Sequence, residues 1–261
     1  MKLFFREFGT SSQAFIIIHG LFGSSDLWIP FAKKLSKSFH VYCPDLRNHG
    51  RSAHSSEFSL NELSDDLIDF INDNNIENPI IMGHSLGGRI AMNFVLNYTG
   101  KIKKLIVLDI SPKAYNINEK QNKLINALSS INPSEFNSFK KLDEKLSENI
   151  NNFMIRQLIL KNIYKTKDKS FAWRSDIKNI LNNLDKISEE IIPVVLGNKN
   201  TFSVETLFIK GGKSDYINDE DVLKIKTLFP KSKIKTIENA SHWLHVDAAE
   251  ELFSAVMNFV S

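Results

Sequence analysis

A short stretch at residues 80–91 restricts the possible folds of this chain more than any other segment. An apolar run of three residues from Ile80 leads into Gly83-His-Ser-Leu-Gly87, and a segment with helical periodicity follows. In a strand-turn-helix context, the G-x-S-x-G pattern predicts a sharp turn that lifts its serine above a sheet, because glycine permits the close backbone approach that such a turn requires. The pattern therefore predicts that Ser85 is a catalytic nucleophile.

The rest of the chain alternates short β-rich runs with longer amphipathic segments. This order is typical of parallel strands joined by crossover helices. Several runs are almost continuously apolar, as strands covered on both faces should be. We therefore expect an α/β fold with a mostly parallel, twisted sheet and helices on both faces. The expected strands are residues 15–18, 41–43, 80–82, 105–108, 206–209 and 234–237, and the expected helices are residues 60–72, 86–98, 221–229 and 248–260.

Helical patterns rich in Lys and Asn replace this rhythm between residues 111 and 199. We expect a helical cap insertion at residues 111–199, which divides the core into a first part, residues 1–110, and a second part, residues 200–261. Large apolar side chains of the insertion are candidates to roof an acyl pocket, although a cap needs the same residue types for its own core. These candidates are Phe136, Phe139, Phe153, Met154, Tyr164, Phe171 and Trp173.

The composition is that of a globular protein, with 42% hydrophobic and 24% charged residues. The formal net charge of +3 is small and the lysines are scattered, which argues against nucleic acid as a partner. No apolar stretch approaches the roughly 18 residues that a membrane-spanning helix needs, and the two-residue apolar run near the start is too short for a signal peptide. We expect a cytoplasmic monomer or homodimer without a membrane span.

Acyl transfer also needs preorganised hydrogen-bond donors for the oxyanion. The backbone N–H of Leu86, directly after the nucleophile, is one such donor by geometry. The second should come from another loop, and the Gly-rich segment that begins at His19 follows the first strongly apolar run. We favour the N–H of Phe22 as this donor, with the N–H of Leu21 as the alternative.

The general base should be a histidine late in the chain, because the order in this type of hydrolase is Ser, acid, His. His242 and His245 both follow the last expected strand. His242 comes directly after that strand, where a base can reach over the sheet, whereas His245 is better placed for local packing or capping. We also expect His19, His84 and Trp243 to line the substrate site.

Six motifs together give the chain a specific resemblance to the α/β-hydrolase superfamily, and within it to the bacterial YbfF-like esterases and their mitochondrial relatives. The resemblance covers almost the whole chain. It implies the α/β-hydrolase fold and the hydrolysis of acyl esters or acyl thioesters. The motifs are His19-Gly-Leu-Phe-Gly-Ser, Asp45-Leu-Arg-Asn-His-Gly-Arg-Ser, Gly83-His-Ser-Leu-Gly-Gly, Asp109-Ile-Ser-Pro, Gly211-Gly-Lys-Ser-Asp-Tyr and Ser241-His-Trp-Leu-His.

The acid that orients the histidine has two candidates. Asp215 lies in the loop after the strand expected at residues 206–209, where most α/β-hydrolases carry the acid. Asp109 ends the strand expected at residues 105–108, one strand beyond the nucleophile. The relatives that this chain resembles pair an Asp at that place with a Ser on the later loop, which Ser214 matches. We favour Asp109, bridged to His242 by Ser214, over Asp215.

The expected reaction is acyl transfer to water, in which Ser85 attacks the carbonyl of a small-molecule acyl ester or thioester and His242 accepts the proton. No cofactor or metal is implied, because the sequence has neither metal-ligand spacing nor a phosphate-binding Gly loop before a helix. Two alternatives stay open. One is a carbon–carbon bond hydrolase or lyase-like enzyme with the same triad, and the other is a non-catalytic ligand receptor on the same fold.

Overall fold

The computed structural model describes residues 1–98, 100–115, 119–192 and 204–261. Within them, seven strands form one sheet in the order β1-β3-β2-β4-β5-β8-β9. Only the pairing of β1 with β3 is antiparallel. The strands are β1 (Phe5–Phe8), β2 (Ala14–Ile18), β3 (His40–Pro44), β4 (Ile80–His84), β5 (Lys104–Leu108), β8 (Thr206–Gly211) and β9 (Ser232–Ile237).

All six expected strands are present, and the expected mostly parallel sheet is confirmed. Strand β1 was not expected, since half of its four residues are charged. It lies at the edge of the sheet, where it pairs with β3 alone. A strand with one neighbour does not need the continuous apolar run that identified the others.

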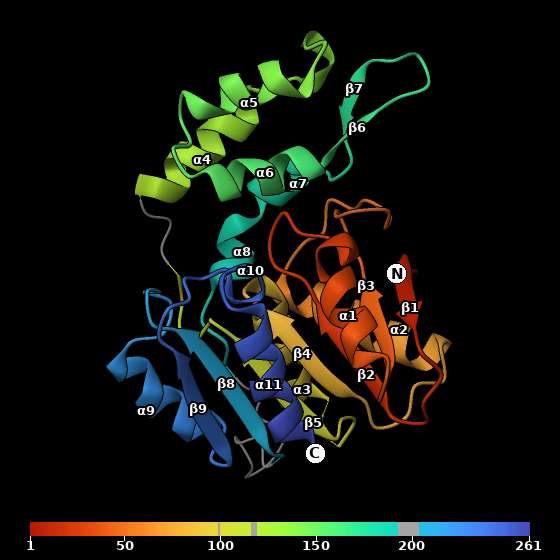
Figure 1. The fold of residues 1–261 in the computed structure, drawn as a ribbon, viewed down its shortest axis with the longest axis vertical. Helices are drawn as coiled ribbons and strands as arrows, with labels where there is room; N and C mark the ends of the chain where they lie inside the picture. Colours follow the sequence, from red (N-terminus) through yellow and green to blue (C-terminus); the bar gives the residue numbers. More distant parts are fainter. Residues whose placement is uncertain (99, 116–118, 193–203) are drawn as a thin grey trace.

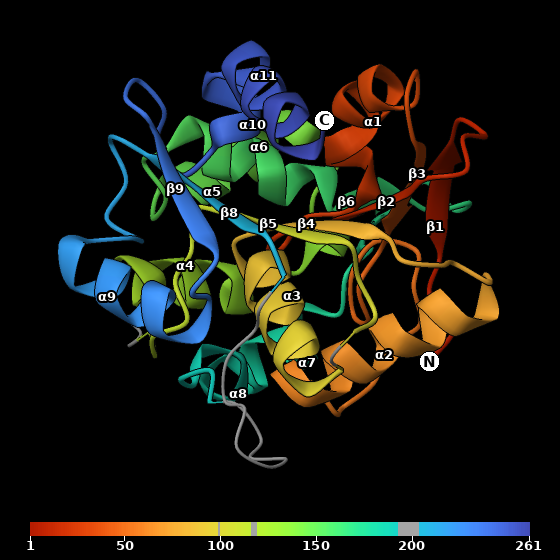
Figure 2. The ribbon, with the colours of Figure 1, turned by 90° about the horizontal axis from the view of Figure 1, so that it is seen from below.

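Helices cover both faces of the sheet (Figure 2). On one face lie α1 (Ile29–Leu35), α10 (Leu244–Asp247) and α11 (Ala249–Val260), and on the other lie α2 (Leu60–Asp73), α3 (Leu86–Asn97) and α9 (Asp219–Leu228). Each face of the sheet has its own hydrophobic core. From strand β2, Phe15 and Ile17 enter the core under α1 and α11, whereas Ile16 and Ile18 enter the core under α2 and α3. Alternate side chains of a strand point to opposite faces, so a fully apolar run is required here.

The described part of the insertion lies above the sheet in Figure 1. Its helices are α4 (Glu119–Ser130), α5 (Phe139–Ser147), α6 (Phe153–Lys161), α7 (Ile177–Asn182) and α8 (Leu184–Ser188), and a short antiparallel hairpin joins β6 (Ile163–Lys165) to β7 (Phe171–Trp173). The helical cap that we expected therefore also contains a hairpin. Its end at residue 199 lies outside the described residues, so the domain boundaries stay a prediction.

Short cap helices begin at polar side chains that accept otherwise unpaired backbone N–H groups. Ser138 accepts from Lys141 N before α5, and Asp176 accepts from Asn179 N before α7. None of the helices in the described residues combines the length and the apolar character needed to cross a bilayer.

Candidate active site

Ser85 occupies the sharp turn between β4 and α3. Its φ of 53° and ψ of −118° are unusual for a residue with a side chain. The two glycines around it are required by packing: a Cβ on Gly83 would lie 2.2 Å from the Gly87 carbonyl oxygen, and one on Gly87 would lie 2.3 Å from the Ile18 carbonyl oxygen. The expected strand-turn-helix geometry of the G-x-S-x-G pattern is therefore present.

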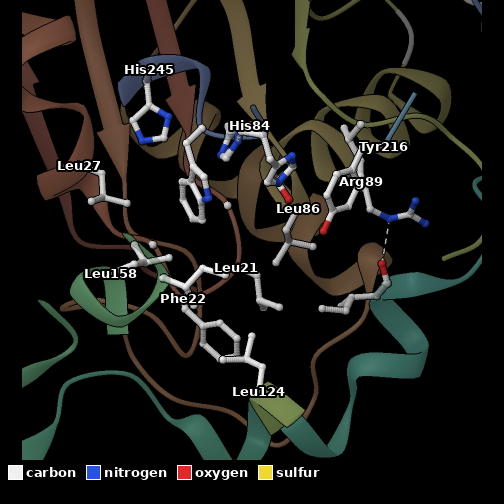
Figure 3. Close-up of a pocket in the computed structure, with 18 of the residues that line it drawn as sticks. Leu21, Phe22, Leu27, His84, Leu86, Arg89, Leu124, Leu158, Tyr216 and His245 are labelled. Carbon is white, nitrogen blue, oxygen red and sulfur yellow. Dashed lines mark hydrogen bonds between the residues drawn. The ribbon is translucent and has the colours of Figure 1, made fainter. Parts of the chain in front are cut away.

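A cavity of about 290 Å³ lies between the carboxyl ends of the strands and the cap, and both Ser85 and His242 line it. Figure 3 shows Leu124 and Leu158 of the cap opposite His84 and His245 of the core. Other apolar lining residues are Leu21, Phe22, Leu27, Trp28, Leu86, Ile110, Ile155, Ile159, Ile187 and Trp243. In the described part of the chain, no three His, Cys, Asp or Glu side chains are grouped so that they could hold a metal ion.

Asp109 is the carboxylate that the fold brings to His242. Its Oδ2 lies 2.7 Å from His242 Nδ1 and also accepts the Ser214 hydroxyl, while its Oδ1 accepts the Gly211 N–H at 2.9 Å. Asp109 is fully buried, whereas Asp215 is exposed to solvent. The structure thus brings Asp109, Ser214 and His242 together and leaves Asp215 apart from them. Asp109 contacts His242 directly, which corrects our expectation that Ser214 bridges the two residues.

Two aromatic side chains hold the His242 segment. The ring of Tyr216 stacks on the imidazole of His242, with centroids 4.0 Å apart and an interplanar angle of 23°. His84 Nε2 lies 2.8 Å from the His242 carbonyl oxygen, and because a carbonyl only accepts, Nε2 carries the proton. Burial lowers the pKa of His84 well below its ordinary value, so this ring is neutral.

The loop after β2 does not offer the backbone donor that we favoured. Phe22, with a φ of 57°, donates its N–H to His49 Nε2 at 3.2 Å. Burial lowers the pKa of His49 to about 3, so the ring is neutral, with its Nδ1–H donated to the Arg47 carbonyl at 2.9 Å and its Nε2 free to accept. The preference for Phe22 is corrected accordingly. Leu21 N–H, which donates no hydrogen bond among the described residues, and Leu86 N–H at the start of α3 remain as candidates.

His19 is buried and does not line the cavity, which corrects our expectation of a substrate contact. Its Nδ1–H donates to the Gly20 carbonyl at 2.8 Å, and its Nε2 accepts the Leu46 N–H at 3.0 Å. His19 therefore ties the loop after β2 to the loop after β3. The other two expected contacts, His84 and Trp243, do line the cavity.

The cap lines the cavity mainly with aliphatic side chains, together with Tyr115 and Ser188. None of the seven cap candidates named above, all of them described, is among the lining residues. Phe139 packs edge-on against Phe171 within the cap, with centroids 4.7 Å apart, and Phe153 is 57% exposed. The actual contacts from α6 are Ile155, Leu158 and Ile159. Their i, i+3, i+4 spacing was the available signal, because it marks one face of a helix.

Arg89 is a site residue that the sequence analysis missed. It lies in α3 and is buried, and its guanidinium donates to backbone carbonyls on both sides of the insertion: Lys113 at 2.8 Å, Ile187 at 2.9 Å, and Glu189. Burial lowers its pKa to about 10. Figure 3 shows its head group at the edge of the cavity, directed away from Leu21. The signal was that Arg89 is the one charged residue of α3, a helix that is otherwise mostly apolar.

The sheet order, the turn at Ser85 and the Asp109–His242 contact define a protein of the α/β-hydrolase class. Residues 13–249 match the family described as alpha/beta hydrolase fold, and the chain belongs to that family. The sn-1-specific diacylglycerol lipase ABHD11 of Mus musculus is 31% identical over 254 residues, which cover 95% of this chain and 81% of the relative. The esterase YbfF of Escherichia coli is 23% identical over 252 residues, covering 96% and 94%. The resemblance to α/β-hydrolase esterases is thereby confirmed.

A solved structure of a marine microorganism esterase superposes with a TM-score of 0.93 at 40% identity and covers 99% of both chains. A thioesterase domain from the curacin biosynthetic pathway superposes with a TM-score of 0.71 at 20% identity, covering 97% of this chain and 94% of that one. The second likeness shows the fold alone.

Proposed function

We propose that this protein hydrolyses carboxylic esters through an acyl-enzyme on Ser85. The observation that carries the proposal is the 2.7 Å contact between His242 Nδ1 and buried Asp109, in a cavity that Ser85 also lines. A buried carboxylate on Nδ1 selects the tautomer in which Nε2 is free to accept a proton, and it stabilises the imidazolium that then forms.

The proposed reaction has two halves. Ser85 Oγ attacks the ester carbonyl carbon while His242 Nε2 takes the hydroxyl proton, and the N–H groups of Leu86 and Leu21 stabilise the oxyanion. The intermediate collapses, and His242 returns the proton to the departing alcohol. Water then attacks the acyl-enzyme while His242 takes its proton, and His242 gives that proton to Ser85 Oγ as the acid leaves.

The cavity wall supports a neutral, apolar acyl group as substrate. Apart from the histidines, the lining side chain that carries charge is Arg89, which is already bonded to backbone carbonyls. Burying an unpaired carboxylate among the aliphatic residues of α6 would be costly. Three of the four similar proteins named above are a lipase and two esterases, which favours an oxygen ester over the thioester that the family resemblance also allows.

A panel of p-nitrophenyl esters and acyl-CoAs of graded chain length, with a fluorophosphonate probe, tests the proposal. We expect ester turnover and covalent labelling by wild type, and neither by Ser85→Ala, whose thermal unfolding should be unchanged. Triad members act as one unit, so the loss should be about 10⁴-fold or more in kcat. An unlabelled wild type would favour a non-catalytic receptor, while labelling without ester or thioester turnover would favour carbon–carbon bond hydrolysis.

A further inference from the structure

Side chains from opposite sides hold the backbone of Phe22 in the loop beside the cavity. From the core, His49 Nε2 accepts the Phe22 N–H at 3.2 Å. From the cap, Asn162 Nδ2 donates to the Phe22 carbonyl oxygen at 2.5 Å, across 140 residues of sequence. The loop that carries Leu21, our candidate oxyanion donor, is therefore bonded directly to the insertion.

Asn162 is built into the cap as a rigid donor. It ends α6, is only 3% exposed, and its Nδ2 also donates to the Leu158 carbonyl at 3.1 Å. Its Oδ1 accepts the Ser175 hydroxyl at 2.6 Å. Two carbonyl partners on one side and a hydroxyl on the other fix the orientation of the amide, because carbonyl oxygens only accept. A buried polar group with every partner in place is rigid.

The bonds at Phe22 determine which N–H can serve the oxyanion. Phe22 has a φ of 57°, a conformation that a residue with a side chain adopts only when its surroundings enforce it. His49 and Asn162 supply that enforcement from both sides of the residue. The preceding N–H, that of Leu21, has no hydrogen-bond partner among the described residues, and it lies beside the cavity that Ser85 lines.

We infer that Asn162 is a positioning residue for the reaction: through the Phe22 carbonyl, the cap sets the geometry of the oxyanion loop. This inference rests on the proposed acyl-enzyme chemistry. The cap thereby contributes to the rate constant for chemistry as well as to the shape of the pocket. Figure 3 shows Leu158, from the same helix, close to the loop of Leu21 and Phe22.

Asn183 provides a matched control in the same cap. It is 6% exposed, and its Nδ2 donates to one core carbonyl, Ser56, at 3.3 Å and to the carbonyl four residues earlier in its own helix, Asn179, at 2.8 Å. Asn162 makes the same pair of bonds, to Phe22 in the core and to Leu158 four residues earlier. Ser56 does not line the cavity. Both asparagines attach the cap to the core, but only Asn162 bonds the loop that carries Leu21. Equivalent changes at the two residues therefore separate the effect of weaker cap attachment from the effect of a displaced oxyanion loop.

The experiment compares Asn162→Asp and Asn162→Ala with Asn183→Asp and Asn183→Ala in the full chain. The substrate is p-nitrophenyl butyrate, and hydrogen exchange is followed in peptides that cover residues 19–24. We expect both Asn162 variants to lose about 10- to 100-fold in kcat while KM stays within about threefold of wild type. A displaced Leu21 N–H would stabilise the transition state less well but would affect substrate binding little. We expect the Asn183 variants to stay within about threefold of wild type in kcat. Exchange at Phe22 N–H should accelerate in the Asn162 variants alone.

Three results would overturn the inference: an Asn162 variant with wild-type kcat, equal losses at Asn162 and Asn183, or a change confined to KM. The Ala variants control for a loss of kcat caused by the carboxylate that the Asp variants introduce. Thermal unfolding of all four variants shows whether each is folded. A wild type without ester turnover would defeat the proposed function instead. The exchange measurement would then still decide whether Asn162 holds the loop.

Discussion

Asp109 Oδ2 lies 2.7 Å from His242 Nδ1, although the two residues are 133 positions apart in the chain. Asp109 follows β5, and His242 follows β9, with β8 between these strands in the sheet. Because all three strands are parallel, the loops at their carboxyl ends meet at one edge. Ser214, from the loop after β8, donates its hydroxyl to the same carboxylate oxygen that contacts His242.

We expect Asp109→Asn to lower kcat for ester hydrolysis by about 10⁴, because an amide on Nδ1 favours the wrong imidazole tautomer. Asp215→Asn should leave kcat within about threefold of wild type, since this exposed carboxylate contacts no part of the proposed triad. Steady-state kinetics of the two variants side by side check the assignment. A large loss of kcat in Asp215→Asn, together with a near-normal kcat in Asp109→Asn, would reverse the assignment of the acid.

The ring of Tyr216 gives a second prediction, because it stacks on His242 at 4.0 Å. An aromatic face stabilises a cation by about 0.5–2 kcal/mol, so Tyr216→Leu should lower kcat about 2- to 30-fold. Tyr216→Phe retains the ring and should keep the wild-type kcat. Equal kcat values for the Leu and Phe variants in steady-state kinetics would show that the stack does not act on the base.

Arg89 joins the two ends of the insertion to α3, the helix that begins at the nucleophile. Arg89→Met keeps the unbranched apolar stem of the side chain but leaves the carbonyls of Lys113 and Ile187 without this donor. We expect the free energy of unfolding to fall by about 2–4 kcal/mol. Urea unfolding measures this loss, and hydrogen exchange should accelerate near residues 111–115 and 187–191. An unchanged urea midpoint would show that the carbonyls find other partners.

Much of the fold follows from local sequence. The buried strands were identified because both faces of each must be apolar, as Ile16 and Ile17 illustrate by entering opposite cores. Ser85 was identified because its turn tolerates only glycine at positions 83 and 87. Asp109 required the resemblance to known esterases, since chain order and strand position alone also allowed Asp215.

The remaining features depend on contacts between distant segments. The bond from Phe22 to His49 exists only once the loops after β2 and β3 meet, so the sequence favoured the wrong backbone donor. His19 was expected in the pocket for its residue type, but two backbone groups use both of its nitrogens. Large cap aromatics such as Phe153 looked like pocket residues from size alone, whereas the helix face determines what reaches the cavity.

Buried histidines should make the fold sensitive to mild acid. Burial lowers the pKa of His49 to about 3 and that of His245 to about 4, against about 6.5 in an unfolded chain. Below pH 6.5 the unfolded chain therefore binds protons that the folded chain does not, so the free energy of unfolding falls as the pH falls. Each such histidine should remove about 1.4 kcal/mol between pH 7.5 and 5.5, where carboxylates stay ionised.

The test is a difference between wild type and a variant, because every other titrating group then contributes equally to both proteins. His245 stacks on Trp28 with centroids 4.7 Å apart, so His245→Phe keeps an aromatic ring in that place without a titrating group. Its loss of stability between pH 7.5 and 5.5, from urea unfolding, should be smaller than the wild-type loss by about 1.4 kcal/mol. Equal losses in the two proteins would mean that His245 takes up its proton as readily folded as unfolded.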